Sequence, residues 1–187
     1  IDPAAWSGRT TRLPLPTGVA TARLDDGGNC FNLNSVVSGQ PGVPGAPLLV
    51  RPAGLMQFIQ LMQVLGVAEP EARRVATALA DWVDTDSQAM LDGAEDAAYA
   101  GRAPGYRTGN TFLADASELR AVAGVTPELY ARLKPWICAL PTSDLSPINP
   151  NSVTPDQAPL VAMLFPDLVP VERARARAAG RTRAVAR

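Results

Sequence analysis

The sequence predicts an α+β fold, in which a small β part is followed by a larger body of helical hairpins. Two observations predict this class. Residues 1–47 contain short apolar stretches of strand length, and from Leu55 onward the apolar residues recur about every 3.6 positions. We expect three parts: a β part at 1–47, a helical part at 48–134 with an acidic loop at 81–96, and a last part at 135–187. The last part should hold a strand-like segment, a helical hairpin and an arginine-rich end.

The β part begins with predicted strands and ends in a loop. Residues 18–24 alternate apolar and polar side chains, and Asp25-Asp26-Gly27-Gly28-Asn29 follows as a turn-forming run. This pattern predicts a strand, a turn at 25–29 and a returning strand at 30–34. Residues 39–47 carry glycine at every third position, but three glycines cannot specify a collagen helix, so we expect a stiff exposed loop.

Helices are predicted where apolar side chains share one face. The first runs from Leu55 to Gly66, which takes the C-terminal cap position, and the second begins near Pro70 and buries Trp82. Asp115 and Thr154 begin two capping boxes. The further helices are expected at 94–100, at 115–123, at 126–134, from Thr154 and from about Pro170.

Composition argues against an enzyme. The chain has 187 residues, a formal net charge of −1, two cysteines and no histidine. The absence of histidine excludes Ser-His-Asp and Cys-His catalysis and every histidine-ligated metal site, and two cysteines cannot form a four-thiolate site. No apolar run approaches the ~20 residues of a membrane-spanning helix.

The segment 81–96 concentrates negative charge. It holds six of the eighteen acidic residues, and no Lys or Arg occurs between Val75 and Gly101. Oxygen ligands on a flexible loop suit calcium, although Ala89 stands where an EF-hand has its glycine. A solvated acidic loop and a general acid–base pair of a hydrolase are the alternatives, the second disfavoured by the lack of aromatic platforms. Positions 1, 3, 5, 9 and 12 of an EF-hand-like loop correspond to Asp84, Asp86, Gln88, Asp92 and Glu95.

The two cysteines, Cys30 and Cys138, lie in strand-like segments 108 residues apart. In an oxidising compartment a disulfide between them would close a long loop and contribute about 4–5 kcal/mol in the chain-entropy model. The alternative is two buried free thiols.

Residues 117–136 are similar to helix-hairpin-helix units that bind DNA phosphates through backbone amides. Here the hairpin contains Pro127, which has no amide, and then Glu128, so DNA binding is disfavoured. A DNA-binding protein of the DNA-uptake type remains the alternative function.

An ordered set of motifs spreads over most of the chain. The motifs are CFNLNS at 30–35, LADWVDTD at 79–86, GAED at 93–96, Tyr99, Tyr106-Arg107, Asn110, SELR at 117–120, GVT at 124–126 and INPN at 148–151. In this order they resemble the K-type minor pseudopilins of the bacterial type II secretion system (general secretion pathway protein K, GspK).

The resemblance implies a pilin-like β scaffold into which a large helical domain is inserted. It implies a non-enzymatic subunit that caps the tip of the pseudopilus and helps to initiate its assembly for protein export across the outer membrane. The partners implied are the I-type and J-type minor pseudopilins, and the H-type as a further candidate, with no nucleic acid. Family members carry an N-terminal helix in the inner membrane, so this chain is expected to be a periplasmic portion that lacks the helix and part of the sheet.

The resemblance also implies calcium, because the family binds calcium in its helical domain. The residues that match the family's motif are Asp84, Asp86, Glu95 and Asp96, and Asp92 is added from spacing alone. We therefore expect these five carboxylates to form the metal site.

Overall fold

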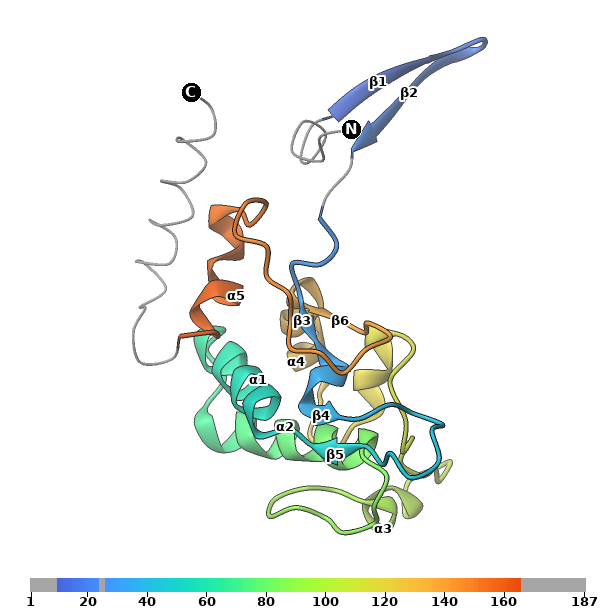
Figure 1. Ribbon diagram of the computed structural model, residues 1–187, viewed down its shortest axis with the longest axis vertical. Helices are drawn as coiled ribbons and strands as arrows, with labels where there is room; N and C mark the ends of the chain where they lie inside the picture. The colour runs from blue at the N-terminus through green and yellow to red at the C-terminus, as the bar shows by residue number, and fades with distance from the viewer. Residues whose placement is uncertain (1–9, 24–25, 166–187) are drawn as a thin grey trace.

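The computed structural model describes residues 10–23 and 26–165 (Figure 1). Their strands form three separate two-stranded sheets: β1 (Thr10–Leu15) pairs with β2 (Gly18–Arg23), β3 (Phe31–Asn32) with β6 (Ile137–Cys138), and β4 (Val37–Ser38) with β5 (Leu49–Val50). The first and third pairs are antiparallel and the second is parallel. No larger sheet forms among the described residues.

The helices make up the larger body. The α-helices are α1 (Pro52–Val64), α2 (Glu69–Val83), α3 (Asp96–Ala100), α4 (Pro127–Leu133) and α5 (Ala158–Ala162). The 3-10 helices are η2 (Leu33–Val36), η3 (Ala116–Ala121), η4 (Lys134–Trp136) and η5 (Pro155–Gln157). Short strands beside this helical body confirm the predicted α+β class.

Helix α2 begins where the sequence predicts, whereas α1 begins at Pro52, three residues before the predicted start at Leu55. Both α1 and α2 have a proline in the first turn, and Gly66 follows α1 with a φ of +84° that favours glycine. Asp115 and Thr154 each form the expected capping box. Early in α1, Gly54 lies so close to the carbonyl oxygen of Ser35 that a side chain there would collide with it.

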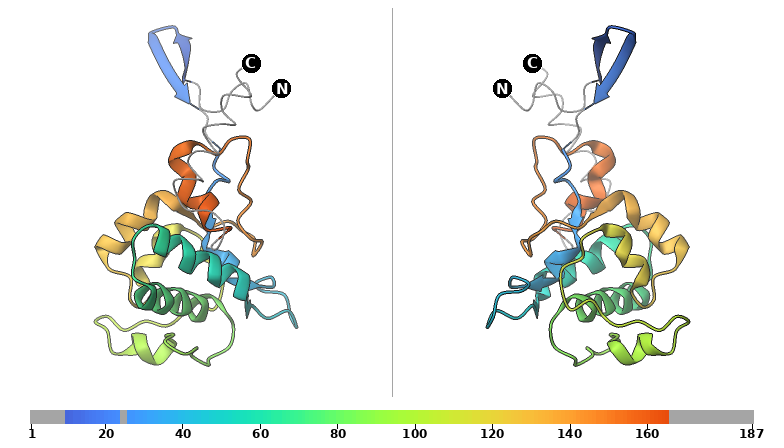
Figure 2. Two further views of the ribbon diagram at one scale, coloured as in Figure 1. Left: turned by 90° about the vertical axis from the view of Figure 1, so that its left-hand side faces the viewer. Right: turned by 90° about the vertical axis from the view of Figure 1, so that its right-hand side faces the viewer.

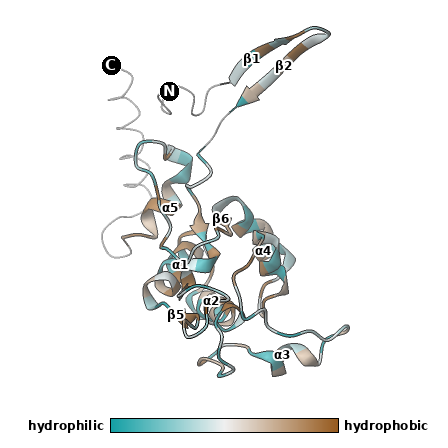
Figure 3. Cartoon of the chain, turned by 45° about the vertical axis from the view of Figure 1, so that its right-hand side comes forward, coloured by the Kyte–Doolittle hydropathy of each residue, from teal (hydrophilic) through white to brown (hydrophobic). Residues whose placement is uncertain are grey.

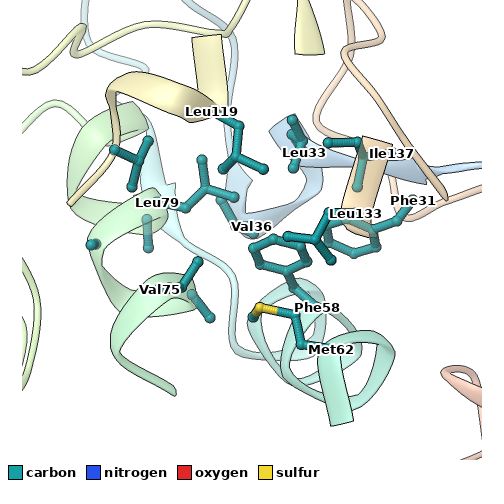
Figure 4. Close-up of a cluster of buried hydrophobic side chains, with 14 of the residues drawn as sticks. Phe31, Leu33, Val36, Phe58, Met62, Val75, Leu79, Leu119, Leu133 and Ile137 are labelled. Carbon is teal, nitrogen blue, oxygen red and sulfur yellow. The ribbon is translucent and has the colours of Figure 1, made fainter. Parts of the chain in front are cut away.

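One core joins the short strands to the helices (Figure 4). The rings of Phe31 from β3 and Phe58 from α1 stack with their centroids 4.9 Å apart. The other side chains labelled in the figure are Leu33, Val36, Met62, Val75, Leu79, Leu119, Leu133 and Ile137. The β part and the helical body therefore share buried apolar surface, which is the main stabilising contribution in such a domain.

The hairpin β1–β2 lies apart from this core (Figures 1 and 2). Almost all of its residues are exposed, including Leu13, Leu15 and Val19, and Figure 3 shows hydrophobic and hydrophilic residues mixed along it. The opposite end of the molecule carries α3 and the segment between α2 and α3.

The predicted pairing of residues 18–24 with 30–34 is wrong. Strand β2 turns back on β1, where Leu15 pairs with Gly18 across a two-residue turn. Residues 26–29 instead make hydrogen bonds with the segment 149–152: Asn149 Nδ2 donates to Asp26 Oδ2 at 3.1 Å, and Asn149 N donates to Asn29 Oδ1 at 2.8 Å. These polar side chains bind partners 120 and 123 positions away, which local turn rules do not anticipate.

Two other segments are more irregular than predicted. The returning strand ends after Asn32, because the Asn32 side chain accepts the N–H of Asn34 and begins η2. The helix at 115–123 is the 3-10 helix η3. The helix expected from Pro170 and the arginine-rich end lie outside the described residues, and the three-part division of the chain stays a prediction.

A disulfide joins Cys30 to Cys138, as predicted, with the two Cα atoms 5.8 Å apart. It lies beside the parallel pair β3–β6, in which Asn32 is the register partner of Cys138. The bridge thus holds the two ends of the 108-residue span together. None of the described helices has the length and apolar character that a membrane-spanning segment requires.

Candidate metal centre

Three carboxylates converge in the segment that joins α2 to α3. One oxygen each from Asp84, Asp86 and Glu95 lies within 4.8 Å of the other two. Asp84 is 2% exposed and Glu95 is 8% exposed, whereas Asp86 lies at the surface. This cluster therefore combines two buried carboxylates with an opening to solvent on one side.

The ends of two helices position these side chains. Helix α2 ends at Val83, so that Asp84 occupies its C-terminal cap, and Glu95 takes the position before α3. Asp86 is fixed by its own loop, because its Oδ1 accepts the N–H of Gln88 at 2.8 Å. The cluster is thus assembled from residues that leave regular helix geometry.

Asp81, in the last turn of α2, holds the loop that follows this helix by hydrogen bonds. Its carboxylate accepts the N–H of Met90 at 3.1 Å and the N–H of Ala94 at 2.7 Å, and the residue is fully buried. Gly93 lies so close to this carboxylate that a Cβ atom there would collide with it. Asp81 is therefore a structural residue of the loop, with its oxygens engaged by backbone donors.

Two oxygens in the cluster have no hydrogen-bond partner in the described part of the chain. They are Asp84 Oδ1 and Glu95 Oε1, and both are buried. A buried carboxylate oxygen without a donor or a cation is costly, since desolvation is not compensated. These two oxygens are the strongest structural argument that the cluster suits a cation.

The electrostatics agree with this geometry. Burial, together with the charges of Asp86, Asp81 and Glu95, raises the pKa of Asp84 to about 7. Burial, followed by the charge of Asp81, also raises the pKa of Glu95. Without a cation, Asp84 and Glu95 therefore keep their protons to a higher pH than carboxylates in water do.

The structure does not bring the other two predicted ligands into this cluster. Asp92 is exposed and has a φ of +66°. Asp96 faces the segment that follows α3: its Oδ1 accepts the N–H of Thr108 at 2.9 Å, and its Oδ2 lies 3.8 Å from Nε of Arg107. The hydrogen bonds from Thr108 lower the pKa of Asp96.

Thr108 links Asp96 to the cluster, because its hydroxyl lies 2.9 Å from Asp96 Oδ1 and 3.4 Å from Glu95 Oε2. An aromatic group backs the same region: the ring of Trp82 makes edge contacts with Tyr99 at 5.1 Å and Tyr106 at 5.9 Å. Together these contacts hold α3 and the following segment against the end of α2.

Sequence reasoning counted Asp81 among the acids of the loop but gave it no role. Its position could have distinguished Asp81 from the other acids of the loop. It precedes Trp82 within the predicted helix, and the last turn of α2 is buried on all sides. Thr108 carries no such signal, because it reaches the cluster only through the fold.

Chemically, the cluster suits a hard cation. Three carboxylates supply oxygen ligands without nitrogen or sulfur, which is the donor set that calcium prefers. Of two grooves on the described part of the surface, one is lined by Tyr106 and residues of η3, and the other by residues around Phe112 and Pro141. Neither groove is lined by these carboxylates, so the geometry favours cation binding over the acid–base pair of a hydrolase.

Residues 29–142, which include this cluster, match the family described as "Type II secretion system (T2SS), protein K". The chain belongs to this family. Type II secretion system protein K of Klebsiella pneumoniae is 40% identical over 170 residues, which are 91% of this chain and 51% of the relative. Its counterpart in Aeromonas hydrophila is 40% identical over 172 residues, 91% of this chain and 52% of the relative.

A solved structure agrees with the family. A chain in the crystal structure of the GspK-GspI-GspJ complex of the type 2 secretion system from enterotoxigenic Escherichia coli matches with a TM-score of 0.72 and 34% identity. The match covers 86% of this chain and 55% of that one. It confirms the expected fold class, and the DNA-binding alternative finds no support. The chain spans about half the length of the curated relatives it matches.

Proposed function

We propose that this chain is part of a minor pseudopilin that acts as a structural subunit at the tip of the type II secretion pseudopilus. The fold match to a chain of the GspK-GspI-GspJ complex, at 34% identity over 86% of this chain, carries the proposal. The role would be to cap the filament and help to start its assembly during protein export. No catalytic step is assigned to it.

The partners follow from the same match. The related structure is named as a complex of GspK with GspI and GspJ, so we assign I-type and J-type minor pseudopilins to this chain as partners. The protein would work in the periplasm, anchored to the inner membrane. The disulfide between Cys30 and Cys138 supports an oxidising compartment, because such bonds persist there.

Co-purification tests the assembly role. The chain, tagged and co-expressed with the I-type and J-type pseudopilins of its own secretion system, should elute with both in one complex. A pilin subunit from an unrelated filament serves as the matched control and should not bind. If instead the chain alone binds duplex DNA with an affinity that falls steeply with salt, the DNA-binding alternative is correct.

We further propose that the carboxylate cluster binds calcium. The two buried, unpartnered oxygens of Asp84 and Glu95 carry this proposal. Asp86 is exposed, so an ion with its water ligands would reach the cluster from that side. The ion would neutralise three converging charges and tie the end of α2 to the start of α3.

Calorimetric titration with calcium chloride tests the site. The protein should bind calcium, and Asp84→Asn should weaken binding at least about tenfold, because a buried ligand charge is lost. Asp156→Asn, a change of the same chemistry at an exposed position in η5, is the control and should bind as the original does. Equal affinity in both variants would contradict the assignment.

A further inference from the structure

Thr85 stands between two carboxylates of the cluster and also holds a distant part of the chain. Its N–H donates to the carbonyl oxygen of Leu48 at 3.2 Å, and the N–H of Leu48 donates to Thr85 Oγ1 at 3.1 Å. Thr85, in the acidic loop 81–96, therefore binds both the N–H and the carbonyl group of Leu48. The two residues are 37 positions apart in the sequence.

Leu48 is the point at which the glycine- and proline-rich loop 39–47 returns to the core. Its side chain is fully buried, whereas most residues of the loop are exposed. Beyond Thr85, the loop is held mainly at its base. The strands β4 and β5 that flank it are two residues each, and Ser143 Oγ donates to the carbonyl oxygen of Gly39 at 3.0 Å. A shift of Thr85 would therefore change the position of Leu48, which lies at one end of the loop.

The loop forms one wall of a surface groove. Gly39, Gln40 and Pro41 line it on one side, and Phe112 and residues 141–144 complete it. The shape of this groove consequently depends on how the base of the loop is held.

We propose that cation binding at Asp84, Asp86 and Glu95 is coupled through Thr85 to the loop 39–47, so that the ion fixes the loop and its groove. This inference rests on the proposed calcium site. Without an ion, the carboxylates on both sides of Thr85 repel each other, and the backbone between them is free to shift. With the ion, Asp84 and Asp86 are drawn to one point, and Thr85 is locked in the geometry that binds Leu48. Such coupling is reciprocal: whatever loosens the loop base weakens the binding of the ion.

Hydrogen exchange with mass spectrometry, on the protein with and without calcium, tests the coupling. Calcium should slow amide exchange in the peptides that cover residues 39–50 by about fivefold or more. Thr85→Val keeps the shape of the side chain but removes the hydroxyl, so this protection should be at least halved. Thr85→Ser retains the hydroxyl and is the matched control, which should respond as the original protein does.

A second variant tests the reverse direction. Gly39 has a φ of +121°, and a Cβ atom there would press on the carbonyl oxygen of Pro47 at the base of the loop. Gly39→Ala lies outside the carboxylate cluster, yet it should weaken calcium binding in calorimetry by about fivefold. Gly42→Ala, in the same loop with positive φ but with no atom near its Cβ, should leave calcium affinity unchanged.

The possible failures are distinguishable. If calorimetry shows calcium binding but exchange at 39–50 is unaffected, or if Thr85→Val responds in full, the coupling is wrong and the metal site stands. If calorimetry shows no binding to the original protein, the metal site and the coupling are both overturned.

Discussion

The side-chain amide of Asn34 exchanges two hydrogen bonds with the backbone of Leu113, 79 positions later in the chain. Asn34 Nδ2 donates to the carbonyl oxygen at 3.0 Å, and the N–H of Leu113 donates to Asn34 Oδ1 at 2.8 Å. The same Nδ2 group donates to the carbonyl oxygen of Leu140 at 2.9 Å, and Asn34 is fully buried. One side chain therefore connects three segments that share no regular sheet.

We expect Asn34→Ala to destabilise the protein by about 2–4 kcal/mol, because it leaves buried backbone groups of Leu113 and Leu140 without partners. Urea unfolding followed by tryptophan fluorescence measures this loss. Asn151→Ala, at an exposed position, is the control and should change the free energy of unfolding by less than about 0.5 kcal/mol. Similar losses in both variants would refute a special role for Asn34.

The ligand set divides into residues inside and outside the cluster. Asp86→Asn should weaken calcium binding strongly, whereas Asp92→Asn should have a small effect, because Asp92 lies exposed outside the three-carboxylate group. Asp96→Asn should act on the position of Thr108 more than on the ion. The calcium affinities of the three variants, measured by calorimetry, show which of these residues bind the ion. A loss at Asp92 as large as that at Asp86 would restore the wider five-residue set.

The ion-free protein should lose stability as pH rises from about 4 to 7. The pKa of Asp84 is 3.8 in its ordinary state and about 7 in the fold, so between these values the native state holds a proton that the unfolded chain releases. The free energy of unfolding then falls with pH, by at most about 1.4 kcal/mol per unit for this one group. Glu95 and Asp81, whose pKa values are also raised, act in the same direction.

Denaturation in a chelator at several pH values measures this slope. Asp84→Asn has no proton to release, so its slope should be smaller, and calcium should stabilise the original protein more at pH 8 than at pH 5. Asp26 and Asp96 have lowered pKa values, and the stability that they contribute is lost only when pH falls below about 4. A steeper slope in Asp84→Asn than in the original would exclude this account.

Gly93→Ala should break the hydrogen bonds by which Asp81 holds the acidic loop 81–96. Its new methyl group would collide with Asp81, displacing the carboxylate that binds the N–H groups of Met90 and Ala94. We expect a loss of about 1–3 kcal/mol and weaker calcium binding. Gly101→Ala meets no atom near its Cβ and should be neutral in both measurements. Unaltered melting and calcium affinity in Gly93→Ala would show that the loop does not depend on Asp81.

Reducing the Cys30–Cys138 disulfide should lower the free energy of unfolding by about 4–5 kcal/mol, since the bridge closes 108 residues. Thermal melts with and without dithiothreitol measure the effect. The double variant Cys30→Ala, Cys138→Ala should already melt at the lower temperature and should not respond to reductant. If dithiothreitol does not change the melting temperature of the original protein either, the bridge contributes no stability.

The sequence by itself determined the features that depend on local chemistry. Helices α1 and α2, the first-turn Pro70 of α2, Gly66 and both capping boxes were readable because these signals act within four residues. The motifs placed the chain in its family, and the concentration of acids in 81–96 located the candidate metal site.

Only the tertiary structure decided which residues meet. It paired β2 with β1, let Asn34 hold Leu113 and Leu140, and separated Asp84, Asp86 and Glu95 from Asp92 and Asp96. These outcomes depend on contacts between segments up to 126 positions apart and on burial, which removes water as a competing partner. Spacing along a chain cannot show which oxygen will lack a donor after folding.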